Sequence, residues 1–94
     1  MKARKSKDLQ KALQNQGFES FSEKDYHQLH YLVVEGKKQA VFTYIGKAPL
    51  SPELMEIVSE QLKFTDEKVA ESFFSGKLMA EEYVAMLREK ELLS

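Results

Sequence analysis

Two runs of β-branched and aromatic residues, with a turn at Glu35-Gly36 after the first, constrain the fold of this chain more than any other feature. The first run covers residues 26–34 and the second covers residues 39–45. Such runs favour extended backbone, and a glycine-containing loop between them is typical of a β-hairpin. Phe18 and Phe21 begin a further extended stretch upstream. The sequence therefore predicts three strands in an antiparallel sheet.

The segments on either side of the strands have helical periodicity. Leu9, Ala12 and Leu13 predict an amphipathic helix over residues 6–16, with Ser6 as its N-cap and Gly17 as its terminator. Downstream, Ser51-Pro52-Glu53 predicts the start of a second helix that ends near residues 63–64. The predicted apolar stripe of that helix consists of Leu54, Ile57, Val58 and Leu62.

The last thirty residues predict two short helices. Thr65 is the expected cap of the first, whose buried face holds Val69, Phe73 and Phe74. The second has its apolar face at Met79, Tyr83, Met86 and Leu87. Strands on one side and helices on the other indicate a two-layered α+β fold. We expect residues 1–64 to form the main domain and residues 65–94 a helical extension packed on it.

Composition excludes several classes of protein. A chain of 94 residues is one small domain, and without cysteine it has no disulfide framework, thiolate nucleophile or cysteine zinc site. No apolar run approaches the ~20 residues of a membrane span, and no signal peptide is recognisable. We therefore expect a cytoplasmic protein that does not enter membranes.

The net charge of −1 conceals an uneven distribution. Residues 1–52 hold nine lysines and arginines against five acids, whereas residues 53–94 hold five against ten. Phosphate binding is largely electrostatic, so the N-terminal lysines are candidate RNA contacts. These are Lys5, Lys7 and Lys11 around the first helix, Lys37 and Lys38 at the hairpin tip, and Lys47 after the last strand, with Lys2 and Arg4 nearby. The alternative is a solvated helix face and a charged sheet edge that resists aggregation.

The two histidines are the candidate acid–base residues, because histidine titrates near neutral pH. His27 and His30 both lie in the predicted second strand, where residues three apart point to opposite faces. They therefore do not share a metal site, and we expect neither a metal nor a cofactor. One can act as a general base while the other packs, and a purely structural role is the alternative for both. Periodicity does not decide which of them is accessible.

No other catalytic template is present, since the chain lacks G-x-S-x-G, P-loop, G-x-G-x-x-G and H-E-x-x-H patterns. The strands do contain aromatic residues that can stack on nucleic-acid bases, namely Tyr26, Tyr31, Phe42 and Tyr44. At alternating strand positions, however, we expect most of them to belong to the core.

Three segments resemble one known family. These are KDLQKALQNQGF at residues 7–18, HQLHYLV at 27–33, and VFTYIGKAPLSPELMEIVSEQLKF at 41–64. They resemble the first helix, the second strand, and the third strand with its loop and long helix in the HicA-type toxins. Those toxins are small RNA-cleaving proteins of type II toxin–antitoxin pairs. The resemblance implies a fold like that of a double-stranded-RNA-binding domain, α-β-β-β-α, with one or two extra C-terminal helices.

The resemblance also implies a function. His27 matches the family's catalytic histidine, which would deprotonate a ribose 2′-hydroxyl for attack on the adjacent phosphodiester without a metal. The lysines would hold the RNA backbone. The expected partners are mRNA and an antitoxin protein that holds the enzyme inactive.

Two alternatives remain open. Asp25-Tyr26 stands where the family usually has Gly-Ser, which keeps a non-catalytic RNA- or protein-binding module in view. The other alternative concerns residues 65–94, which hold seven acids against four bases. In this hypothesis they lie over the basic face as a built-in mimic of the antitoxin.

Overall fold

The hairpin predicted around Glu35-Gly36 is present in the structure, a computed structural model that describes residues 1–22 and 28–94. It consists of β2 (Gln28–Val34) and β3 (Lys37–Ile45), which pair antiparallel. Glu35 and Gly36 have φ values of 53° and 77°, as two-residue hairpin turns of the primed type require. Because this turn is so short, Lys37 and Lys38 belong to β3 and not to the tip.

β1 (Phe18–Ser22) pairs antiparallel with β2 and completes a sheet with the strand order β1-β2-β3. The predicted α+β fold with a three-stranded antiparallel sheet is thus confirmed. The sheet edges are β1 on one side and β3 on the other. The predicted second strand starts two residues earlier than β2, at residues that lie outside the described ranges.

The helices are α1 (Ser6–Asn15), α2 (Pro52–Gln61), α3 (Glu67–Phe74) and α4 (Ala80–Glu89). The Ser51 side chain caps α2 as predicted, by accepting a hydrogen bond from the backbone N–H of Leu54 at 3.2 Å. Gly17, with φ of 90°, follows the C-cap of α1 and ends this helix as predicted.

Two predicted caps are wrong. Ser6 is the first residue of α1 and not its cap, because its hydroxyl donates a hydrogen bond to the backbone oxygen of Gly46 at 2.6 Å. Asp66 takes the place predicted for Thr65 at the start of α3. The Asp66 carboxylate lies 2.8 Å from the backbone nitrogen of Lys68, and the threonine hydroxyl is one residue too far upstream for this bond.

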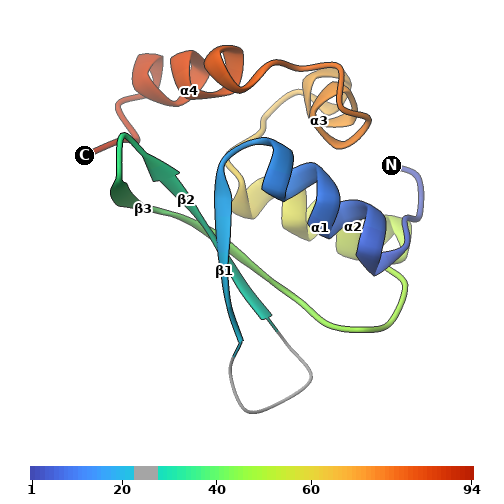
Figure 1. The fold of residues 1–94 in the computed structure, drawn as a ribbon. Coiled ribbons are helices and arrows are strands. Elements are labelled where there is room, and N and C mark those ends of the chain that lie inside the picture. Colours follow the sequence, from blue (N-terminus) through green and yellow to red (C-terminus); the bar gives the residue numbers. More distant parts are fainter. Residues whose placement is uncertain (23–27) are drawn as a thin grey trace.

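Among the described residues, the helices cover one face of the sheet and leave the other exposed. In β3, alternate residues from Gln39 to Ile45 are buried and the residues between them are exposed. The helices lie on the buried side (Figure 1), and every helix and strand contributes to one hydrophobic core. Its largest fully buried apolar side chains are Leu9, Leu13, Leu32, Ile45, Met55, Leu62, Phe73, Tyr83 and Leu87.

The predicted apolar stripe of α2 is partly wrong. Val58 and Leu62 are buried, but Leu54 and Ile57 are 47% and 50% exposed, and Met55 is fully buried instead. Apolar residues occupy adjacent positions in this helix, so its sequence is compatible with more than one buried face. α2 packs against β3, and this contact selects the face that contains Met55.

Residues beyond 64 contribute three of the five rings in the aromatic part of the core. We call this part the buried aromatic cluster: Phe18, Phe64, Phe73, Phe74 and Tyr83. The rings of Phe73 and Tyr83 have centroids 4.8 Å apart, and both contact the ring of Phe18 on β1. Residues 65–94 therefore pack against the sheet through a shared set of rings. Among the described residues, no helix combines the length and apolar character needed to cross a membrane.

Candidate nucleic-acid interface

The candidate catalytic residue, His27, lies outside the described residues, as do Asp25 and Tyr26. In the chain His27 directly precedes Gln28, the first residue of β2. Its assignment as a general base stays a prediction.

His30 is a packed residue of the inner sheet face. Its side chain has no solvent exposure, and neither ring nitrogen has a hydrogen-bond partner among the described residues. Burial lowers the pKa of His30, because the charged imidazolium is poorly solvated there. The ring is therefore neutral and inaccessible to a substrate at neutral pH, so it has the structural role that the sequence left open.

Three of the predicted lysines gather at α1. Lys5 precedes the helix, while Lys7 and Lys11 are one turn apart on its surface, and all three are exposed. The hydrogen bond from Ser6 to Gly46 holds the loop after β3 against this end of α1, and the backbones of Arg4 and Leu50 also pair there. The structure thus brings the exposed Lys47 to the same end of the molecule. We call Lys5, Lys7, Lys11 and Lys47 the basic end.

Lys37 and Lys38 do not belong to the basic end. They begin β3, whereas Lys47 follows its last residue, and nine strand residues span about 26 Å at ~3.3 Å per residue. Both are exposed. The six candidate lysines therefore form two groups at opposite ends of one strand.

Arg4 has a structural role. Its guanidinium donates two hydrogen bonds to the Glu71 carboxylate, at 3.2 and 2.8 Å, and lies 5.2 Å from the centre of the Phe74 ring. The hydrogen bond from Arg4 is the main cause that lowers the pKa of Glu71. This ion pair links the N-terminal segment to α3, and the Arg4 guanidinium is engaged in it.

The hypothesis that residues 65–94 cover the basic face is wrong. Lys5, Lys7 and Lys11 are all exposed, so no acidic helix lies over them. The apolar faces of α3 and α4 are instead used in the core, where Phe73 and Tyr83 are fully buried.

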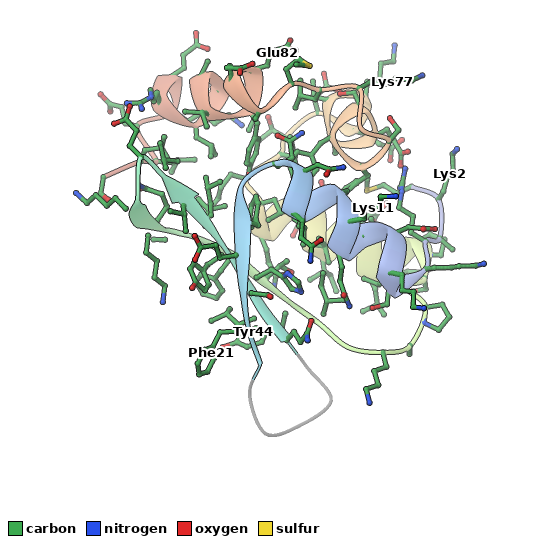
Figure 2. The ribbon with its side chains drawn as sticks, in the orientation of Figure 1. Lys2, Lys11, Phe21, Tyr44, Lys77 and Glu82 are labelled. Atoms are coloured by element: carbon green, nitrogen blue, oxygen red, sulfur yellow. The ribbon has the colours of Figure 1, made fainter. Side chains whose placement is uncertain are left out.

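The strand aromatics correct another expectation. Phe42 and Tyr44 are each 46% exposed, Tyr31 is half-buried, and Phe21, which the sequence did not single out, is 57% exposed. Figure 2 shows Phe21 and Tyr44 at the same end of the sheet, on the side away from the helices. The alternation within residues 38–44 separates the two faces of the strand. Because both faces carry apolar residues, the sequence does not show which one is exposed to solvent.

Among residues 1–22 and 28–94, no group of three or more histidine, aspartate or glutamate side chains is placed to hold a metal ion. In comparisons with known proteins, no family model, no curated protein and no solved structure matches this chain.

Proposed function

We propose that this protein is a HicA-like RNA-binding protein that cleaves RNA with His27 as a general base. The basic end carries the proposal. It combines the exposed Lys7 and Lys11 of α1 with Lys5 just before the helix and Lys47 from the loop after β3. Such a cluster attracts the phosphate backbone of RNA whatever its base sequence.

The order of elements supports the same proposal. α1 precedes three antiparallel strands in sequence order, α2 follows them, and both helices lie on one side of the sheet (Figure 1). This is the order of a double-stranded-RNA-binding domain, a fold that reads the shape and backbone of RNA more than its sequence. α3 and α4 follow these five elements and correspond to the extra C-terminal helices expected from the sequence.

RNA binding is tested by removing charge from the basic end. We expect Lys7→Gln/Lys11→Gln to weaken RNA binding roughly tenfold at physiological salt and to reduce the salt slope by about 1.4, at about 0.7 per phosphate contact. Fluorescence anisotropy at several salt concentrations measures both quantities. The control is Lys68→Gln/Lys77→Gln, which removes two exposed lysines from the region of α3. Equal losses in both variants would contradict a localised site.

Cleavage is tested separately. Production of the wild type in a bacterial host should arrest growth and degrade mRNA, and His27→Ala should relieve both effects while it retains RNA binding. Equal growth and intact mRNA with both proteins would remove the catalytic part of the proposal. If RNA binding persisted in that case, the protein would be a non-catalytic RNA-binding module.

A further inference from the structure

The outer face of the sheet carries aromatic side chains in two adjacent rows. One row runs across the three strands through Phe21, Leu29 and Tyr44, and the next through Glu19, Tyr31 and Phe42. Rows on one face are ~7 Å apart along a strand, and neighbouring strands are ~4.8 Å apart. We call Phe21, Leu29, Tyr31, Phe42 and Tyr44 the aromatic platform.

The rings of the platform differ in their availability. Phe21, Phe42 and Tyr44 are each about half exposed, and Phe42 and Tyr44 meet edge to face with centroids 6.2 Å apart. Tyr31 is half-buried, and the ammonium group of Lys38 lies 4.7 Å from the centre of its ring. Three rings are therefore accessible beside a cation on the same face.

The platform face carries a cation that can meet a phosphate. Lys38 points to the platform, as its contact with Tyr31 shows, whereas Lys37 is the preceding residue of β3 and by strand alternation belongs to the opposite face. Glu19 is the acidic residue of the two aromatic rows. Aromatic rings with neighbouring cations are the elements with which proteins bind single-stranded nucleic acid, because every base has a face that can stack.

The size of the platform suits a few bases of nucleic acid. Two rows across three strands form a flat footprint of roughly 200 Å². Two or three stacked bases fit this area, as on the sheets of known RNA-binding modules.

We propose that the aromatic platform stacks two or three bases of single-stranded RNA, while Lys38 binds an adjacent phosphate. This inference rests on the proposed RNA-binding function and names its substrate class. The platform lies on the face opposite to α1, so it forms a contact region separate from the basic end. Losses caused by variants in the two regions should multiply.

The test uses a labelled 12-nucleotide RNA and a duplex of the same sequence, both with 2′-O-methyl sugars that block attack by the 2′-hydroxyl. Phe42→Leu and Tyr44→Leu keep apolar side chains and remove the rings. We expect each to weaken single-strand binding roughly 5- to 100-fold and to change duplex binding less than twofold. Phe21→Leu, on a different strand, provides an independent third variant.

The control is Leu54→Ala/Ile57→Ala, which alters exposed apolar residues of α2 and should leave both affinities unchanged. Urea unfolding confirms that each variant is folded. Single-strand affinity within twofold of wild type in all three ring variants would overturn the platform, and a loss in Lys7→Gln/Lys11→Gln would then leave the proposed function standing. Absence of RNA binding by the wild type would overturn both. A wild-type dimer that the ring variants dissociate, with RNA affinity unchanged, would assign this face to a second copy and overturn the proposal.

Discussion

The buried aromatic cluster and the aromatic platform contain the same types of side chain in opposite surroundings. Phe73 and Tyr83 have no solvent exposure, whereas Phe42 and Tyr44 are each 46% exposed. The cluster collects its rings from β1 and from the chain after α2, and the platform collects its rings from the strands alone. Aromatic residues of this protein are therefore buried in the core where helices cover the sheet and are exposed to solvent where no helix lies over it.

Each region also includes a cation near a ring. The cation of the buried cluster is held in an ion pair, whereas the cation of the platform is exposed. Arg4 lies over Phe74 and is held by Glu71 in a two-bond ion pair. Lys38 lies over Tyr31 and is exposed. A planar guanidinium suits a fixed, partly buried pair, while a flexible ammonium group can leave the ring for a phosphate.

The largest effect should come from removing a ring from each region. We expect Phe73→Ala to lower the free energy of unfolding by about 3–5 kcal/mol, because it leaves a cavity among four other rings. Phe42→Ala should cost about 1 kcal/mol or less, the scale of strand preference at an exposed position. Urea unfolding of the two variants measures the difference. Equal losses would show that the platform is as important for stability as the cluster.

A smaller effect on the free energy of unfolding distinguishes the hydroxyl of the buried Tyr83 from that of the exposed Tyr44. The buried Tyr83 hydroxyl donates a hydrogen bond to the backbone oxygen of Leu62 at 2.8 Å, and burial raises the pKa of its phenol. Tyr83→Phe leaves that carbonyl without its partner, so we expect a loss of about 1–2 kcal/mol. Tyr44→Phe is the matched control and should have the stability of the wild type in the same unfolding assay. A neutral Tyr83→Phe would mean that water replaces the bond.

The smallest effect concerns His30. This residue lies on the inner face of β2, whereas Leu29 and Tyr31 lie on its outer face. Its lowered pKa means that the unfolded chain binds more protons than the folded one below pH ~6.5. Titration of His30 therefore leaves the free energy of unfolding unchanged above that pH and lowers it as the pH falls from there towards the lowered pKa.

We expect His30→Leu to remove this decline and to stabilise the protein at neutral pH by about 1 kcal/mol, because two unpartnered ring nitrogens are no longer buried. Unfolding curves for both proteins between pH 4.5 and 7.5 test the prediction. Glu71 has a lowered pKa in both proteins and acts at lower pH, so the difference between the curves isolates His30. Parallel pH profiles for the two proteins would contradict it.

Local chemistry was sufficient to predict most of the elements. Glu35-Gly36, Gly17 and Ser51 each occupy the predicted turn, terminator and cap, because these roles depend on backbone conformation within a few residues. The errors arose where the partner is distant in the sequence. Ser6 is not a cap because it bonds Gly46, forty residues away, and Leu54 is exposed because α2 packs against β3 through the face that contains Met55.

The candidate site divides in the same way. Residue types and charge alone identified the lysines, and their division into the basic end and a separate pair required the length and direction of β3. Alternation in the strands identified two faces, both rich in apolar residues. Only the tertiary structure decided which face the helices cover, because burial depends on the total area that all elements remove from water together. That choice placed Phe18 and His30 inside and left Phe21, Phe42 and Tyr44 outside.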